Sequence, residues 1–171
     1  MTLEERLFAR YVGKGLLLDS NLLLVFLTGA SDPALFSRFK RVSSFTIKDY
    51  ELLVRLLASF TVLLTTPHIL TEVSNLANSL PQQFKAVWFR NFATLIASGR
   101  ATPGLRERWM PATELVQMTE FGDFGITDAA LTRLSSEALV ITEDYRLSGS
   151  LRSRGVPVLN FGDLRKLQQL L

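Results

Sequence analysis

The sequence predicts a helix-rich α/β fold built on a parallel sheet. The last third of the chain alternates helical and strand-like stretches, at residues 126–136, 139–142, 145–154, 156–161 and 163–170. Successive strands separated by a helix pair in parallel, because a crossover connection returns the chain to the same end of the sheet. A second observation is the apolar run Leu16–Leu18, which is typical of a strand buried on both faces.

Composition narrows the class of protein further. The chain has 171 residues, of which 47% are hydrophobic, and this suits one domain spanning residues 1–171. There are no cysteines, so disulfides, thiolate zinc sites and cysteine nucleophiles are excluded. The net charge of +3 neither requires nor excludes a nucleic-acid partner. The N-terminus lacks a signal-peptide pattern and the longest apolar region, Leu52–Leu64, contains Arg55, so we expect no membrane span and a cytoplasmic location.

The first hundred residues predict mainly helices around two strands. Thr46 and Asp49 have the spacing of a capping box, and Pro67 suits the first turn of a helix. The expected helices cover residues 2–13, 21–28, 47–59, 67–79 and 82–98, with a short one near Phe36 and Phe39, and the strands cover 16–18 and 60–64.

The middle of the chain has weaker signals. Residues 100–108 are rich in arginine and are expected to form a loop. Pro111 and Glu114 indicate a helix that ends near residue 120, and Phe121–Gly125 has the composition of a turn.

Two acids directly follow predicted strands. Asp19 comes after Leu16–Leu18, and Asp144 comes after the run that ends at Thr142. Each could simply be the N-cap of the helix that follows it. Parallel strands end at the same edge of a sheet, however, and ligands bind at that edge in open α/β folds.

Two further acids lie in predicted helices. Glu72 falls within the apolar stripe of the helix from Pro67, where it is either a functional acid, a buried ion-pair partner or a residue at the edge of the stripe. Asp128 lies in the first turn of its helix, where the helix dipole alone would favour it. A cluster of four carboxylates would repel itself unless a cation were bound, and oxygen ligands suit Mg²⁺ or Mn²⁺. Such clusters commonly hydrolyse phosphodiesters.

These segments resemble, in order, the motifs of the PIN-domain ribonucleases. The matching stretches are LLLDSNLLL (16–24), PHILTEVSNL (67–76), GITDAAL (125–131), VITEDYRL (140–147) and the closing RGVPVLNFGDL (154–164). The resemblance implies a three-layer α/β/α fold with a central, mostly parallel sheet. It also implies an Mg²⁺- or Mn²⁺-dependent endoribonuclease, similar to toxins of the VapC type, that acts by attack of water on an RNA phosphodiester. The long segment between Gly29 and Pro67 departs from the compact toxins.

The resemblance assigns roles residue by residue. Asp19, Glu72, Asp128 and Asp144 would be the catalytic metal ligands, Thr142 would support the last of them, and Asn21 would orient Asp19. Arg146 is expected to contact the RNA substrate. The resemblance implies RNA and an antitoxin protein as partners, and we also expect a second copy of the chain in a homodimer.

Several residues have competing interpretations. His68 is expected at the surface or at a helix cap, although it could touch the site, and Glu143 could replace Asp144 as a ligand. The leucines of residues 47–64 are either additional core or a partner-binding face. The main alternative function is a catalytically inactive PIN-like RNA-binding or scaffold module. A phosphatase with a nucleophilic Asp is disfavoured, because Asp19-Ser20-Asn21 lacks the second acid of the Asp-x-Asp pattern.

Overall fold

A computed structural model of the chain describes residues 3–99 and 104–169. Its centre is a five-stranded, all-parallel sheet flanked by helices, in the strand order β3-β2-β1-β4-β5. The strands are β1 (Leu16–Leu18), β2 (Val62–Thr65), β3 (Gly104–Glu107), β4 (Leu139–Thr142) and β5 (Val158–Asn160). This arrangement confirms the predicted helix-rich α/β class with a parallel sheet.

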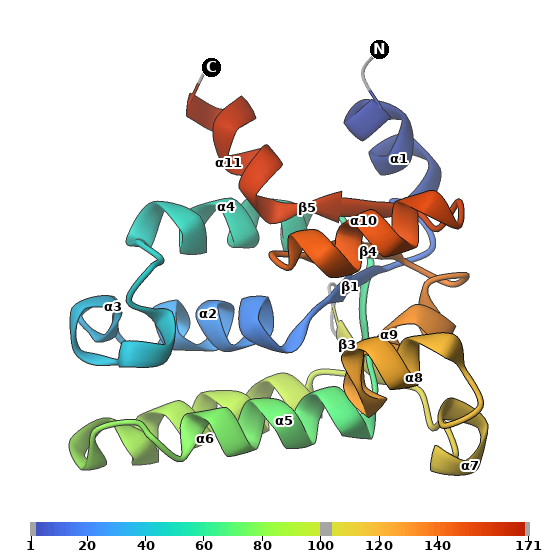
Figure 1. Cartoon of the computed structure of the whole chain (residues 1–171). Helices are drawn as coiled ribbons and strands as arrows, with labels where there is room; N and C mark the ends of the chain where they lie inside the picture. Colours follow the sequence, from blue (N-terminus) through green and yellow to red (C-terminus); the bar gives the residue numbers. More distant parts are fainter. Residues whose placement is uncertain (1–2, 100–103, 170–171) are drawn as a thin grey trace.

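The helices connect the strands and cover the sheet (Figure 1). In chain order they are α1 (Leu3–Tyr11), α2 (Ser20–Ser31), α3 (Leu35–Arg38), the 3₁₀ turn η1 (Lys40–Val42), α4 (Ile47–Ala58), α5 (Pro67–Ala77), α6 (Gln82–Ala97), α7 (Ala112–Leu115), α8 (Thr119–Phe124), α9 (Ile126–Leu134), α10 (Tyr145–Ser153) and α11 (Phe161–Gln169). No helix in the described ranges is long and apolar enough to cross a bilayer.

The segment between Gly29 and Pro67 contributes to the core. In Figure 1, α2 lies between α4 on one side and the α5–α6 pair on the other, and α2 contacts all three helices. The leucines of α4 are buried in the protein's own core. Gly29 allows a close approach of α2 and α4, because a Cβ atom there would lie 2.3 Å from the Tyr50 ring. The leucine-rich stretch is therefore structural.

Local signals in the sequence explain where α4 and α5 begin. Asp49 and Thr46 form the predicted capping box of α4. Pro67 occupies the first turn of α5, and the Thr66 hydroxyl accepts a hydrogen bond from the Ile69 N–H.

Two predictions for the middle of the chain were wrong. Residues 104–107 form the edge strand β3, which pairs with β2, although the stretch 100–108 was expected to be a loop; residues 100–103 lie outside the described part. Phe121–Phe124 belongs to α8, although a turn was expected, and the helix expected up to residue 120 is divided between α7 and α8. The corner falls at Gly125, whose φ of 88° is strained for residues with a side chain.

Candidate functional site

A small pocket lies at the carboxyl ends of the central strands. The residues that line it are Asp19, Ser20, Asn21, Glu72, Asp128, Thr142, Asp144 and Leu147. The pocket thus brings together all four carboxylates predicted from the sequence, although they are spread over more than a hundred positions. Its volume of about 80 Å³ is the room of two or three water molecules, or of an ion with one or two, since one water occupies about 30 Å³ in the liquid.

Asp19 is buried and held by three hydrogen bonds. It caps α2, because its Oδ1 accepts a bond of 2.8 Å from the Leu22 N–H. Its Oδ2 accepts bonds from the Thr142 hydroxyl at 2.5 Å and from the Glu143 N–H at 3.0 Å. A carboxylate has about four acceptor positions, so these bonds leave little capacity for a further ligand. The N-cap interpretation and the site interpretation of Asp19 are therefore compatible.

The pKa of Asp19 is raised from its ordinary value. Burial is the largest cause, the three hydrogen bonds act in the opposite direction, and the negative charge of Asp144 raises the pKa further. Asp19 is therefore fixed in place and surrounded by negative charge.

Asp144 also combines capping with a position in the pocket. Its Oδ1 accepts hydrogen bonds from the N–H groups of Arg146 and Leu147 at the start of α10, which leaves Oδ2 without a bond to the described residues. The Thr142 hydroxyl accepts a bond from the Asp144 N–H while donating to Asp19. Thr142 thus connects the first and last carboxylates of the set, a wider role than the predicted support of one site.

Glu72 projects from α5 toward the other acids. The Ser20 hydroxyl donates a 2.9 Å hydrogen bond to its Oε2. Sequence reasoning missed Ser20, and the available signal was its position directly after Asp19 at the start of a helix. Asn21 lines the same pocket, but its side chain makes no hydrogen bond to the described residues, so the predicted contact with Asp19 is absent there.

Asp128 is the acid of the pocket whose carboxylate has no partner among the described residues. It lies in the first turn of α9, just after the corner at Gly125, and it makes no hydrogen bond or ion pair with the described residues. Its pKa is raised to about 7, first by burial and then by the negative charges of Asp19, Glu72 and Asp144. Asp128 therefore has both oxygens free, and a cation or a proton would relieve its charge.

The chemistry of the donor set fits a divalent cation. All the charged groups are carboxylates, which Mg²⁺ and Mn²⁺ prefer, and no basic side chain lines the pocket in the described structure. Among the described residues, however, no three His, Cys, Asp or Glu side chains are already arranged to hold one ion. Asp128, Glu72 and Asp144 each have a carboxylate oxygen without a hydrogen bond to the described residues, so these three side chains would hold a cation bound there.

Other candidate residues have structural partners. Glu143 donates its backbone N–H to Asp19, but its carboxylate forms an ion pair with Arg165. The Arg146 guanidinium lies 5.5 Å from the centre of the Phe124 ring. His68 is half-buried, and Thr66 provides the cap that the sequence analysis considered for His68.

Neither protein-family models nor curated proteins gave a match to this chain. The function must therefore be inferred from the pocket itself and from the motif resemblance.

Proposed function

We propose that the protein is a metal-dependent endoribonuclease that hydrolyses RNA phosphodiesters. The observation that carries this proposal is the convergence of four carboxylates, from four separate segments, on one pocket that no basic side chain lines among the described residues. Helix capping explains the positions of Asp19 and Asp144 but not those of Glu72 and Asp128, and clustering like charges raises the free energy of the folded protein unless a cation is bound. The order of the motifs supports the same proposal.

A bound Mg²⁺ or Mn²⁺ would activate the attacking water and stabilise negative charge on the leaving oxygen. Asp128 and Glu72 would supply the free oxygens that hold it, with Asp144 contributing Oδ2. Asp19 would contribute mainly fixed negative charge, because Thr142, Leu22 and Glu143 already occupy most of its acceptor positions.

The neighbouring groups orient these acids. The Ser20 hydroxyl fixes one oxygen of Glu72 and leaves the other free, and Thr142 fixes Asp19 relative to Asp144. Groups that are positioned before the substrate arrives reduce the reorganisation needed during the reaction. Arg146 follows Asp144 on α10 and would contact a phosphate of the bound strand.

The proposal is tested by cleavage of an end-labelled single-stranded RNA. We expect cleavage in Mg²⁺ or Mn²⁺, none in EDTA, and a loss of at least about 100-fold in Asp128→Asn and Asp19→Asn, since each removes a charge from the site. Asp123→Asn is the matched control, because Asp123 is an exposed acid on α8 that does not line the pocket. Cleavage that survives both chelation and the two site substitutions would reject the proposal.

Metal binding provides a separate measurement. Calorimetric titration with Mn²⁺ should give heat of binding to the wild-type protein and to Asp123→Asn, but not to Asp128→Asn. Binding without RNA cleavage by the wild-type protein would instead favour the inactive PIN-like module.

The proposed partners are those expected from the sequence. They are an RNA substrate, an antitoxin protein that blocks the site, and a second copy of the chain in a homodimer, and the proposed location is cytoplasmic. Size measurement in solution and cleavage in the presence of a co-expressed neighbouring gene product would test these partners.

A further inference from the structure

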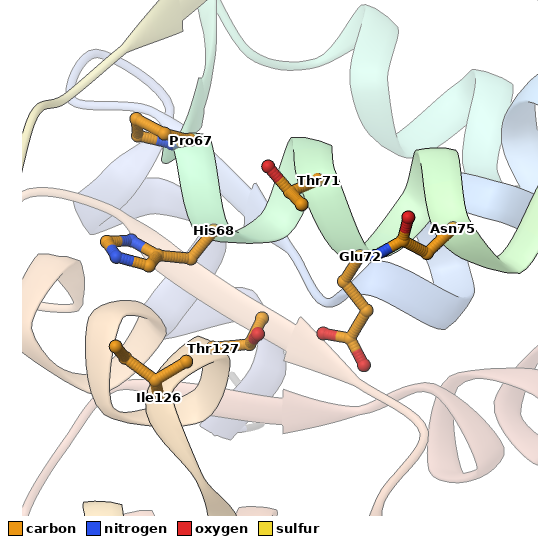
Figure 2. A pocket seen from close by; sticks show the side chains of 7 residues that line it. All are labelled: Pro67, His68, Thr71, Glu72, Asn75, Ile126 and Thr127. Carbon is orange, nitrogen blue, oxygen red and sulfur yellow. The ribbon is translucent and has the colours of Figure 1, made fainter. Parts of the chain in front are cut away.

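A second, larger cleft adjoins the acidic pocket. It lies between α5 and α9 and has a volume of about 370 Å³, within the usual range of about 300–1,000 Å³ for small-molecule sites. Figure 2 shows His68, Thr71, Glu72 and Asn75 projecting from α5, with Thr127 across from them on α9.

The cleft and the acidic pocket are continuous through Glu72. This residue lines both, and Thr127 of the cleft directly precedes Asp128 of the pocket. A ligand in the cleft would therefore lie beside the phosphodiester that the proposed nuclease attacks.

The polar groups of the cleft have unused hydrogen-bonding capacity. His68 Nδ1 is buried and has no hydrogen-bond partner in the described structure. The side chains of Thr71, Asn75 and Thr127 likewise make no hydrogen bonds with the described residues. Because buried polar atoms are normally paired in native proteins, the unpaired Nδ1 marks a hydrogen-bonding position that no described residue fills.

The lining favours a planar, uncharged ligand with polar edges. Pro67 and Ile126 contribute apolar surface to the lining, and the His68 imidazole projects from α5 beside them. Hydroxyl and amide groups can pair with the edge of a base, as Asn does with adenine. A phosphate is disfavoured, because Glu72 is the charged residue in the lining and neither Lys nor Arg is among the described residues there.

We propose that the α5–α9 cleft binds one unpaired base of the RNA strand, next to the phosphodiester that is cut at the acidic pocket. This inference rests on the proposed function, because that function identifies the bound strand as RNA. It makes single-stranded RNA the substrate class and makes His68 and Asn75 the residues that determine base preference.

The test combines the loss of one base from the RNA with the loss of one side chain from the protein. A set of fluorescein-labelled RNA decamers carries one abasic position each, moved along the strand, and binding is measured by anisotropy in Ca²⁺. In the wild-type protein one abasic position should weaken binding by about 5-fold or more, because stacking of a base on an aromatic side chain contributes about 5- to 150-fold in affinity. The same position should cost little in His68→Ala, which removes the stacking ring, and less than in the wild-type protein in Asn75→Ala, which removes a hydrogen-bonding group of the base.

Asn78→Ala is the matched control, since Asn78 is an exposed amide at the C-terminal end of α5 and does not line the cleft. It should keep the full abasic penalty. Asn75 is itself exposed, so Asn75→Ala is expected to fold, and its melting temperature verifies this. An abasic penalty that is unchanged in both cleft variants, or absent at every position in the wild-type protein, overturns the inference.

The two proposals fail in different ways. RNA cleavage in Mg²⁺ without coupling between the cleft residues and an abasic position would overturn the base-binding cleft alone. Coupling between the cleft residues and an abasic position without RNA cleavage would overturn the proposed nuclease activity. It would retain the cleft as the base-binding site of an RNA-binding module.

Discussion

Two groups of acids in this protein differ in whether a cation within the chain pairs with them. Asp49 on α4 and Glu143 after β4 share one cation, Arg165 on α11, at distances of 2.6 and 3.1 Å. The four acids of the neighbouring pocket have no such partner in the described structure. The Arg165 guanidinium also lies 4.7 Å from the centre of the Phe45 ring, so it is fixed by packing as well as by charge.

The two groups differ in whether the chain itself compensates the negative charge of its acids. A carboxylate whose role is structural is best paired within the chain, because an unpaired buried charge destabilises the folded protein. Acids left unpaired at a strand edge are stable only if protons or bound cations reduce their repulsion. The unpaired acids of the pocket therefore lower the free energy of unfolding, whereas the acids paired with Arg165 do not.

The largest expected effect comes from breaking the paired cluster. Arg165→Met keeps an apolar stem but removes the cation from Asp49 and Glu143, and we expect the free energy of unfolding to fall by about 3 kcal/mol. Urea unfolding at pH 7 measures this change. Arg152→Met is the control: its ion pair with Asp163 is exposed, so the loss should be below about 1 kcal/mol. Equal losses of unfolding free energy in the two variants would contradict the expectation that the ion pairs of Arg165 stabilise the fold more than the exposed pair of Arg152 and Asp163.

Removing a charge from the unpaired pocket is expected to have the opposite effect, an increase in the free energy of unfolding. The pKa of Asp128 in the folded protein is raised from 3.8 to about 7, so its protonated form stabilises the protein below about pH 4. That stabilisation is lost as the pH rises through about 7. This pKa shift corresponds to about 4 kcal/mol of unfolding free energy. Contact with water reduces the value to about 1–3 kcal/mol, because the group is partly exposed.

Asp128→Asn should therefore be more stable than the wild-type protein at pH 8 by about 1–3 kcal/mol, with the difference shrinking toward zero near pH 4. Urea unfolding without divalent cations, at pH 4, 6 and 8, measures this trend. Asp123→Asn should give no such pH-dependent difference. A destabilised Asp128→Asn at pH 8 would mean that an internal partner compensates the charge.

The smallest expected effect concerns a positioning hydrogen bond inside the pocket. Ser20→Ala removes the hydroxyl that donates to Glu72, and we expect a loss of about 0.5–1.5 kcal/mol in unfolding free energy. Thermal unfolding in EDTA and in excess Mn²⁺ measures it. A loss that is the same in both conditions would indicate that Ser20 stabilises the fold without positioning Glu72 for the cation.

The quality of the sequence predictions followed the strength of the local signals. The capping box at Thr46 and Asp49, Pro67 at the start of α5 and the apolar run of β1 each predicted an element within a few residues. β3 was missed because an edge strand is stabilised by pairing with β2 rather than by an apolar pattern: Arg106 and Glu107 are exposed.

The same distinction holds for the site. Because parallel strands end at one edge of the sheet, the residues Asp19 and Asp144 could be assigned to that edge from their positions after apolar runs. The hydrogen bond from Ser20 to Glu72 and the ion pair of Arg165 with Asp49 join residues 52 and 116 positions apart along the chain. No local pattern encodes such contacts.

The sequence alone determined the class of fold and the identities of the four acids, because strand and helix periodicity and the order of motifs are local properties. The tertiary structure decided which acids are paired and which are not. It also decided that His68 and Asn75 line a cleft beside the acids, since helix packing between α5 and α9 creates that cleft. The physical reason is that charge compensation and cavity formation depend on distances in space, which the order of residues does not specify.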